Sequence, residues 1–299
     1  MRKNELMRET FKKAVFGDQI IRMVVAPDAL AAKIAEENGA DAVFAAGYAT
    51  SASTLAMPDR GIADFGMMLE RCREIINAVN IPVFADADTG YGDLENVKRT
   101  VRSYEMIGAA GIFLEDQKWP KRCGHMAGKS VEAPEVLEAK IATAVATRQH
   151  DDFLIMSRTD ARAVYGLDDA IARSHRYQDA GADMVFIEAP RNREELVSIH
   201  EAFPTTPLMA NMIEGGATPL TQTADLQRLG FRIVVYPTAM TYAQTYANEA
   251  LLQSLQETGT TQKFEDRMVT FSRFNHFVGL DEVNAREQCY TPEKMKQYL

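Results

Sequence analysis

Short runs of apolar residues recur along the chain, and longer amphipathic segments separate them. Four runs share one local pattern, a glycine followed by a short link and an apolar stretch: ENGADAVF, MIGAAGIFLED, DAGADMVFIEA and RLGFRIVVYP. A glycine at that place is typical of a helix end that leads into a buried strand. Four further apolar runs occupy residues 20–27, 81–88, 152–160 and 206–212. The pattern predicts eight strands.

The segments between the strands have helical spacing. In 93–108, Asp93 can cap the N-terminus, and Leu94, Val97, Val101 and Tyr104 fall on one face. Other helices are expected near 28–38, 66–79, 133–148, 167–180, 193–202, 219–228 and 238–256. Strands and helices that alternate without a composition break predict an α/β fold, a (β/α)₈ TIM barrel forming a single domain over residues 1–299. A doubly wound sheet is the alternative, disfavoured because no Gly-rich turn follows the first strand.

The chain continues past the eight units that a barrel needs. From about residue 257 to 299 the sequence predicts a C-terminal helical extension. Its apolar side chains need a partner surface, and a second subunit is one candidate. The residues concerned are Met268, Val269, Phe271, Phe274 and Phe277.

Composition narrows the class of partner. The chain has 299 residues, 46% of them hydrophobic and 25% charged, which are ordinary globular values. A net charge of −9 argues against nucleic acid, although a local cationic cluster still allows a small anion. Three cysteines at distant positions favour a reducing, cytoplasmic setting over a disulfide framework. We expect neither a signal peptide nor a membrane span.

Acidic residues gather where the predicted strands end, at the end of a barrel that carries chemistry. Asp86 and Asp88 are two apart in the run 81–88, so we expect them to point the same way, and Glu115 ends the next strand. Carboxylates this close repel unless a hard cation such as Mg²⁺ compensates them. Helix capping or pairing with Arg and Lys is the alternative. Zinc is disfavoured because its usual His and Cys spacings are absent.

The stretch EDQKWPKRCGHMAGKS follows Glu115 directly and seats Cys123 among potential cations. A thiol in such surroundings is expected to have a lowered pKa and to be reactive. Gly124 and Gly128 predict a loop that closes like a lid. A solvated basic loop is the alternative reading. The cations are Lys118, Lys121, Arg122, His125 and Lys129.

Other strand ends add polar groups to the same rim. Arg158 belongs to Arg158-Thr159-Asp160 and is expected to grip a substrate carboxylate, flanked by Glu188 and Asn211. A structural pair between Arg158 and Glu188 is the alternative. The second strand ends in Ala46-Gly47-Tyr48.

The motifs DADTGYG, KRCGH, SRTDA, FIEAP and YPTA, in this order, resemble the isocitrate lyase and phosphoenolpyruvate mutase superfamily. The KRCGH element looks like that of the lyase branch, in which the cysteine is the catalytic acid/base. The resemblance implies Mg²⁺-dependent cleavage, with Mn²⁺ as an alternative cation, of a C–C bond in a 2-hydroxy dicarboxylate. A 2,3-dimethylmalate-like or 2-methylisocitrate-like substrate would yield pyruvate or another 2-oxo acid plus a carboxylate.

The resemblance also implies roles for particular residues. A metal would be held mainly by Asp88, with Asp59, Asp86 and Glu115 acting partly through waters. Cys123 would be the proton donor, and Lys121, Arg122 and His125 would stabilise the negative charge that develops. The implied substrate-binding residues are Ala46, Gly47, Tyr48, Gly124, Arg158, Glu188 and Asn211. Relatives form homotetramers by exchanging C-terminal helices, which is expected here too.

Three other functions remain open at this point. An oxaloacetate acetylhydrolase would use the same metal and loop with water as nucleophile. A phosphonate-type mutase, acting on carboxyphosphonoenolpyruvate, is disfavoured by Cys123, because that rearrangement needs no such proton donor. A non-catalytic barrel would be expected to lack the acids or the thiol.

Overall fold

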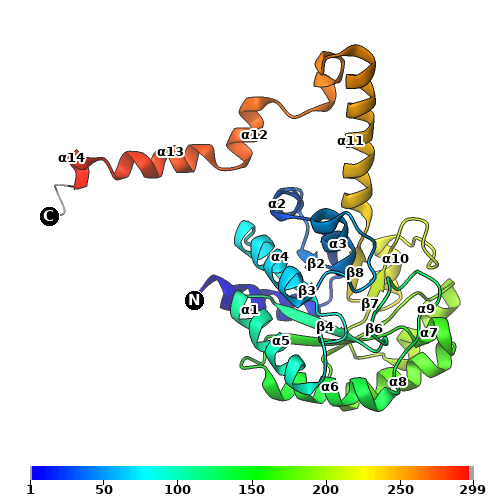
Figure 1. The fold of residues 1–299 in the computed structure, drawn as a ribbon. Coiled ribbons are helices and arrows are strands. Elements are labelled where there is room, and N and C mark those ends of the chain that lie inside the picture. Colours follow the sequence, from blue (N-terminus) through cyan, green and yellow to red (C-terminus); the bar gives the residue numbers. More distant parts are fainter. Residues whose placement is uncertain (1, 296–299) are drawn as a thin grey trace. The chain divides into compact units, whose positions relative to one another are not determined.

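Eight parallel strands form the centre of the computed structural model, which describes residues 2–295 (Figure 1). Neighbouring strands pair in the order β6-β5-β4-β3-β2-β1-β8-β7, and an isolated bridge between Val185 and Leu208 links the two ends. The predicted TIM barrel is confirmed. The strands are β1 Ile21–Val25, β2 Ala42–Ala45, β3 Val83–Asp86, β4 Gly111–Glu115, β5 Leu154–Thr159, β6 Met184–Ile187, β7 Met209–Asn211 and β8 Ile233–Tyr236.

The helices expected from spacing are present, and those before residue 239 surround the sheet (Figure 1). They are α2 Ala29–Glu37, α4 Phe65–Ala78, α5 Leu94–Ile107, α6 Pro134–Thr147, α8 Leu167–Asp179, α9 Arg193–Ala202, α10 Thr223–Arg228 and α11 Ala239–Thr258. Asp93 caps α5 through the Leu94 N–H, as predicted. Val97, Val101 and Tyr104 are buried, but Leu94, in the first turn of α5, is 37% exposed.

Three helices of the barrel were not anticipated. They are α1 Lys3–Val15, α3 Gly47–Leu55 and α7 Ala161–Val164. The α3 helix starts directly after β2, and its first turn has no side-chain cap because Ala46 occupies the cap position. The α1 helix is mostly polar and buries only Arg8, Phe11 and Val15. The segments that form α1 and α3 therefore lack the usual sequence signals of a helix start.

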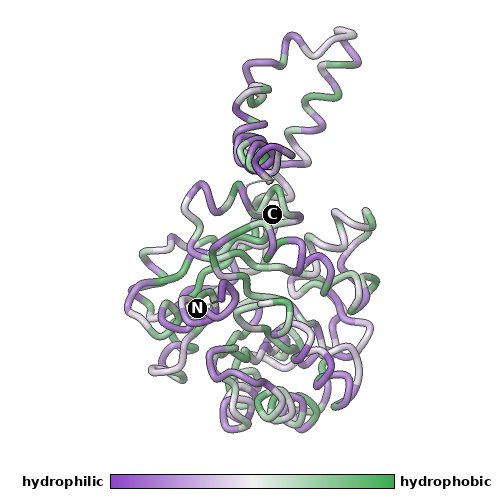
Figure 2. The backbone as a smooth tube through the Cα atoms, turned by 90° about the vertical axis from the view of Figure 1, so that its left-hand side faces the viewer, coloured by the Kyte–Doolittle hydropathy of each residue, from purple (hydrophilic) through white to green (hydrophobic). Residues whose placement is uncertain are grey.

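Aromatic side chains fill the inside of the barrel. Phe44 packs against Phe84 and Phe113, with ring centroids 5.7 Å apart in both pairs, and Phe113 lies 6.3 Å from Phe186. Full burial of each such ring contributes about 1.5–3 kcal/mol. Figure 2 shows hydrophobic stretches gathered within the barrel, with more hydrophilic backbone around them. This packed floor supports the rim at the C-terminal ends of the strands.

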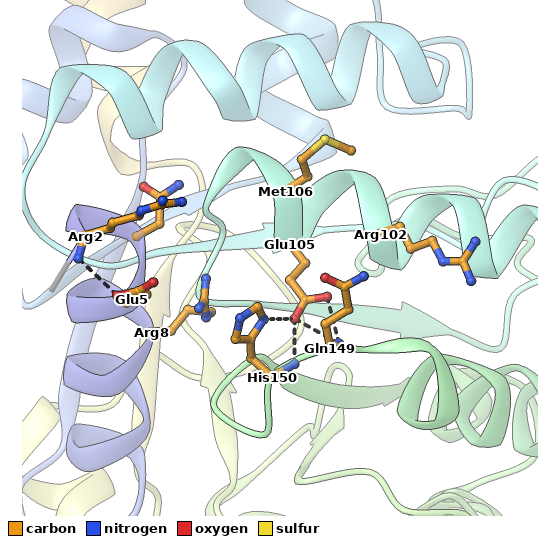
Figure 3. A pocket seen from close by; sticks show the side chains of 9 residues that line it. Arg2, Glu5, Arg8, Arg102, Glu105, Met106, Gln149 and His150 are labelled. Carbon is orange, nitrogen blue, oxygen red and sulfur yellow. Dashed lines mark hydrogen bonds and ion pairs between the residues drawn. The ribbon is translucent and has the colours of Figure 1, made fainter.

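A second, polar cavity of about 420 Å³ lies near the N-terminal ends of β4 and β5, away from the acidic rim (Figure 3). Glu105 is 6% exposed there and accepts hydrogen bonds from the backbone N–H groups of Gln149 and His150. His150 Nδ1 also lies 2.8 Å from the same carboxylate. Glu105 therefore ties the end of α5 to the turn that leads into β5.

The chain from Ala243 onward forms a compact unit separate from Met1–Tyr242. It contains most of α11, the 3₁₀ helix η1 Gln262–Arg267, α12 Phe271–Phe277, α13 Leu280–Cys289 and α14 Pro292–Met295. Phe271 is 87% exposed, and Val269 and Phe274 are also exposed. The apolar tail thus finds little cover within one chain. The assignment of residues 1–299 to one domain stays a prediction, as does the exchange of helices between subunits. Within the described part of the chain, we find no helix with the length and apolarity that a bilayer crossing requires.

Candidate active site

A small cavity at the barrel mouth brings together side chains from most of the strand ends. Its volume is about 50 Å³. Many of the residues proposed from the sequence line it: Ala46, Tyr48, Asp59, Asp86, Cys123, Gly124, Arg158, Glu188 and Asn211. The thiol and two of the predicted metal-binding acids therefore share one cavity, as the sequence reasoning required.

Asp86 and Asp88 converge, but not for the reason expected. The β3 strand ends at Asp86, and Asp88 lies beyond it with a φ of 47°, so the two do not alternate along one strand. The backbone instead turns, and the Asp88 N–H donates to Asp86 Oδ1 over 2.8 Å. Burial is the main cause that raises the pKa of Asp88 to about 7, and the charges of Asp86 and Asp59 add to it.

Lys121 supplies the cation nearest to these acids. Its ammonium lies 2.8 Å from Asp59 Oδ1 and 2.7 Å from Asp88 Oδ1, and all three side chains are buried. Burial opposes the charge of Lys121, but the carboxylates of Asp88 and Asp59 outweigh it and hold the lysine pKa well above its usual range. The sequence reasoning assigned Lys121 to catalysis. In this conformation it neutralises the acidic cluster.

The acidic cluster fits a hard divalent cation by its chemistry. Over residues 2–295, no three acidic, His or Cys side chains are grouped as direct ligands of an ion. The assignment of a metal held mainly by Asp88, with Asp59, Asp86 and Glu115 acting partly through waters, stays a prediction. Mg²⁺ commonly uses one or two carboxylates and keeps several waters, which this donor set allows. Asp88 Oδ1 and Glu115 Oε2 face the cations of Lys121 and Arg158, whereas the buried Glu115 Oε1 has no hydrogen-bond partner among the described residues.

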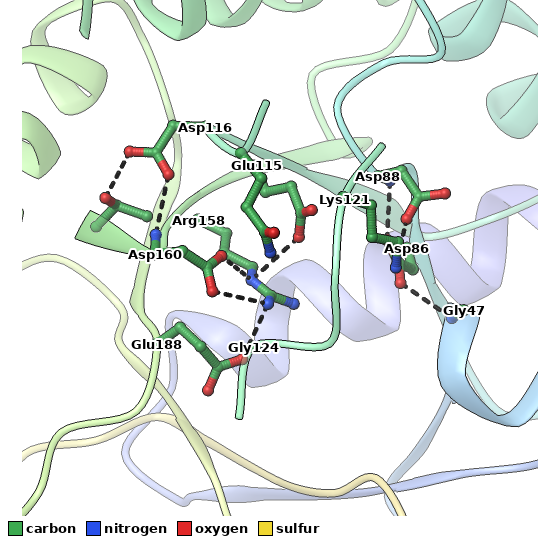
Figure 4. Close-up of polar contacts among 12 residues, drawn as sticks. Gly47, Asp86, Asp88, Glu115, Asp116, Lys121, Gly124, Arg158, Asp160 and Glu188 are labelled. Carbon is green, nitrogen blue, oxygen red and sulfur yellow. Dashed lines mark hydrogen bonds and ion pairs between the residues drawn. The ribbon is translucent and has the colours of Figure 1, made fainter. Parts of the chain in front are cut away.

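Arg158 is the centre of a second charge network (Figure 4). Its guanidinium lies 3.2 Å from Glu115 Oε2, 3.0 Å from Asp160 Oδ2 and 3.2 Å from Glu188 Oε2. The structural pair with Glu188 is thus present, so the Arg158 guanidinium is already paired and is not free to bind a substrate carboxylate in this conformation. Burial disfavours the charge on Glu188, but Arg158 and His125 outweigh it and lower the Glu188 pKa to about 2.

The loop after β4, residues 117–130 and here called the lid, covers this network. A bridge between Gln117 and Val131 and a hydrogen bond from Lys118 N to Ser130 O close its base. Gly124 lies against the Arg158 network so closely that a Cβ there would overlap Glu188. Only a residue without a side chain fits between lid and barrel at this position, and the predicted hinge role of Gly124 stays a prediction.

The expected lowering of the Cys123 pKa is wrong for this closed state. The thiol pKa is raised to about 11, mainly by burial, with smaller contributions from the charges of Asp59 and Glu188. The His125 backbone N–H and Arg158 act in the opposite direction but do not compensate. The cations predicted around the thiol are mostly engaged with carboxylates, so Cys123 is a protonated thiol at neutral pH.

The remaining lid cations take different places. His125 Nε2 lies 3.0 Å from Glu188 Oε1, and its Nδ1 accepts from Ala217 N over 2.9 Å. The proton of a neutral His125 ring is therefore on Nε2 and faces Glu188. Arg122 instead donates to Ala127 O over 3.0 Å within the lid itself. The structure does not bring Arg122 to the acidic cluster.

The substrate-binding positions around β2 and β7 are partly engaged. The Gly47 N–H donates to Asp86 Oδ2 over 3.0 Å, so it positions an acid instead of standing free. Tyr48 Oη lies 3.1 Å from Tyr242 Oη. Asn211 donates to Glu188, and its buried Oδ1 has no hydrogen-bond partner among residues 2–295. Asn211 thus keeps one acceptor available inside the site.

Sequence reasoning missed the residues that support this constellation. Asp160 accepts from Lys129 Nζ over 2.9 Å as well as from Arg158, so it joins lid and barrel. Asp116 accepts from Thr159 Oγ1 over 2.6 Å and from Asp160 N over 2.9 Å. Both acids stand at the ends of predicted strands, and this position could have identified them as site residues. Their partners lie 31 to 44 positions away, and spacing alone does not reveal such pairs.

Comparison with known proteins places these features in a family. A model of the family described as phosphoenolpyruvate phosphomutase matches residues 11–256. The 2,3-dimethylmalate lyase of Eubacterium barkeri is 47% identical over 90% of this chain and 94% of its own length. The chloroplastic carboxyvinyl-carboxyphosphonate phosphorylmutase of Arabidopsis thaliana is 44% identical over 92% of this chain and 83% of its own. A 2-methylisocitrate lyase of Aeropyrum pernix is 38% identical over 89% and 86%.

Solved structures agree. A 2,3-dimethylmalate lyase has a TM-score of 0.89 at 32% identity, covering 97% of this chain and 96% of its own. An oxaloacetate acetylhydrolase with 3,3-difluorooxalacetate also scores 0.89, at 31% identity over 94% and 96%. A phosphonopyruvate hydrolase with oxalate and Mg²⁺ scores 0.86 at 28% identity over 97% and 99%. The chain therefore belongs to the phosphoenolpyruvate mutase family, within the superfamily that its motifs indicated.

Proposed function

We propose that the chain is a Mg²⁺-dependent carbon–carbon lyase that cleaves a 2-hydroxy dicarboxylate of the 2,3-dimethylmalate type into a 2-oxo acid and a carboxylate. The observation that carries this proposal is the shared cavity of Cys123, Arg158 and the acids Asp59 and Asp86. The similarity to a 2,3-dimethylmalate lyase supports it. Neither observation requires the thiol to act as a nucleophile.

In the reaction the 2-hydroxyl proton passes to solvent, the C2–C3 bond breaks and C3 takes a proton from the Cys123 thiol, which then regains one from solvent. A divalent cation held by Asp88, with Asp59, Asp86 and Glu115, would chelate the 2-hydroxyl and its neighbouring carboxylate and acidify that hydroxyl. This donor set resembles sites where Mg²⁺ keeps part of its water shell. Magnesium in a phosphonopyruvate hydrolase of the same fold supports that choice, and Mn²⁺ is the alternative.

Cys123 supplies the proton in this proposal. As C2–C3 breaks, its electron pair moves to C3 and forms an enolate of the leaving carboxylate. A pKa of about 11 keeps the thiol protonated and still acidic enough to protonate such a carbanion. Arg158 lines the same cavity and His125 contacts Glu188 at its wall, and in this proposal both help to stabilise the negative charge that develops there. Lys121 and Arg122 retain their proposed electrostatic roles for states in which the lid moves.

The wall of the cavity supports a substrate with apolar substituents. Arg158 is the cation that lines it, and three carboxylates already neutralise that guanidinium. A third substrate carboxylate would be desolvated without a free positive partner, which is costly. Methyl groups would instead contact the apolar wall. The wall residues are Phe44, Phe113, Phe186, Met209, Ile213, Val235 and Pro237. This favours 2,3-dimethylmalate over 2-methylisocitrate.

An oxaloacetate acetylhydrolase is the second candidate, because such an enzyme matches the fold with a TM-score of 0.89. A substrate panel distinguishes the functions: 2,3-dimethylmalate, 2-methylisocitrate, isocitrate, citramalate and oxaloacetate, each with Mg²⁺, with 2-oxo acid and oxalate release measured. We expect 2-oxo acid from 2,3-dimethylmalate at the highest kcat/KM. Oxalate from oxaloacetate as the dominant product would establish the hydrolase instead. No turnover of any panel member would overturn both.

The assembly and setting complete the proposal. The exposed Phe271, Val269 and Tyr290 of the C-terminal unit support a homotetramer in which these helices cover another copy. Three free cysteines support a cytoplasmic location, and the net charge of −9 disfavours nucleic-acid partners. Size-exclusion chromatography with light scattering tests the assembly. Four chains per particle are expected, and a monomer at micromolar concentration would contradict it.

A further inference from the structure

The loop that carries the proposed metal-binding acids is held in an unusual backbone conformation. It runs from Asp86 at the end of β3 to the start of α5. Asp88 and Tyr91 both have left-handed backbones, with φ values of 47° and 57°. Such conformations cost about 1–3 kcal/mol for residues with a side chain, and they persist only where the surroundings enforce them. The loop therefore needs external support.

Side chains of two helices behind the loop provide that support through its carbonyl groups. Tyr104 Oη donates to Asp86 O over 3.1 Å, and Thr100 Oγ1 donates to Gly90 O over 3.4 Å. Lys140 of α6 donates from Nζ to Thr89 O over 2.7 Å, the shortest of these bonds. Thr89 is the residue next to Asp88. The lysine thus fixes the peptide that follows the proposed metal ligand.

Packing does not account for an ammonium at this place. Lys140 is 9% exposed, and within residues 2–295 no carboxylate lies at ion-pair distance from its Nζ. Asp93 and Glu132 act on it only at longer range. A buried ammonium without a close counterion is costly, and an apolar side chain of similar length would fill the space at lower cost. What the lysine adds is the hydrogen bond to the loop.

We propose that Lys140 is a positioning residue for the divalent cation: by holding the Thr89 carbonyl, it fixes the backbone of Asp88 and thereby the affinity of the acidic cluster for the metal. This inference rests on the metal role in the proposed function. Hydrogen-bonded partners behind metal ligands generally have this effect, and their loss costs about 10–100-fold in metal affinity.

If Lys140 acted only through its charge, its removal would change the affinity for the metal in the opposite direction. Lys140 is a positive charge near the acidic cluster, so removal of that charge would strengthen cation binding if the lysine acted only through its field. If the lysine positions Asp88, its removal weakens cation binding. The direction of the change in Kd therefore separates the two roles.

The experiment measures Mn²⁺ binding to the metal-free full-length protein by electron paramagnetic resonance of free Mn²⁺, without substrate. We expect Lys140→Met to raise Kd for Mn²⁺ by about 10–100-fold. Lys140→Gln, whose shorter donor does not span the gap, is expected to behave alike and serves if the methionine variant fails to fold. Lys98→Met is the matched control, because Lys98 makes an exposed pair with Glu95 on the neighbouring α5. Its Kd is expected within twofold of wild type.

Each outcome has a definite meaning. Unchanged or tighter Mn²⁺ binding by a folded Lys140 variant would overturn the positioning role while leaving the proposed metal site intact. Equal weakening by the Lys98 control would also overturn it, since the effect would then not depend on the hydrogen bond from Lys140 to Thr89. A wild-type protein that binds no Mn²⁺ would overturn the metal role and this inference together. Far-ultraviolet circular dichroism and the thermal midpoint verify that each variant is folded.

Discussion

Gly124→Ala adds a single methyl group at the contact between lid and barrel. A Cβ at Gly124 would lie 2.6 Å from Arg158 Nη2 and would also overlap the Glu188 side chain. The nearest Glu188 atoms would lie at 2.4 Å and ordinary contacts begin near 3.4 Å, so relief requires a displacement of about 1.0 Å (3.4 minus 2.4). Arg158 and Glu188 are locked into one ion network and cannot yield easily. The lid must move instead, and Cys123 moves with it.

A misplacement of about 1 Å at a reacting group costs roughly 100-fold in rate, which corresponds to about 2.7 kcal/mol at 1.36 kcal/mol for each tenfold step. We therefore expect kcat/KM for the panel substrate to fall about 100-fold in Gly124→Ala. The thermal midpoint should change little, because the lid is a surface loop with a closed base. Steady-state release of the 2-oxo acid and a thermal melt provide both numbers.

Ala127→Ser is the matched control, since it also adds one heavy atom to the lid but at an exposed position. It should retain activity within twofold of wild type. If Gly124→Ala kept near-normal kcat/KM, the closed contact between Gly124 and Arg158 would not belong to the catalytic state, and the reasoning about the lid would be refuted.

Three further predictions concern the metal, the opposite end of the barrel and the charge network. Excess EDTA should abolish turnover and added Mg²⁺ should restore it, whereas full activity in EDTA would exclude the metal role. Glu105→Gln should lower the free energy of unfolding by about 1–3 kcal/mol in urea titrations, because it weakens the bonds to Gln149 and His150, while kcat stays within twofold. Because the pKa of Glu188 is lowered from 4.5 to about 2, its ionised form stabilises the fold fully above pH 4.5, and this is lost as the pH falls towards 2. Glu188→Gln should therefore be less stable than wild type by about 2 kcal/mol at pH 7, with the difference shrinking at pH 3, and a constant difference would contradict the assignment.

The pattern of the sequence was sufficient for the architecture. Apolar runs and capping signals such as Asp93 located the strands and most helices, because burial in a parallel sheet and helix capping leave local traces. The α3 helix escaped notice because Ala46 offers no cap and Gly47 starts the helix. A helix that starts without a capping side chain leaves no such local signal in the sequence.

The sequence predicted which residues belong to the site better than it predicted how those residues are arranged. Asp86, Arg158 and Glu188 were predicted as site residues because they follow predicted strands, and the C-terminal ends of barrel strands lie at one rim. The thiol pKa was misjudged because proximity in sequence does not decide which cation pairs with which acid. Lys121 reaches Asp59, which lies 62 positions earlier (121 minus 59), and Arg122 turns back into its own loop. Such choices depend on side-chain direction, which only the folded chain fixes.

Proton delivery by Cys123 to the carbon released from the broken bond is the centre of the proposed chemistry. The most direct test is cleavage of 2,3-dimethylmalate in D₂O with Mg²⁺, followed by mass spectrometry of both products, for wild type and Cys123→Ser. The account predicts equimolar pyruvate and propionate carrying one deuterium at C2 from the wild type, and loss of turnover by at least about 100-fold in the serine variant. Near-normal yield of singly deuterated propionate from Cys123→Ser would contradict it.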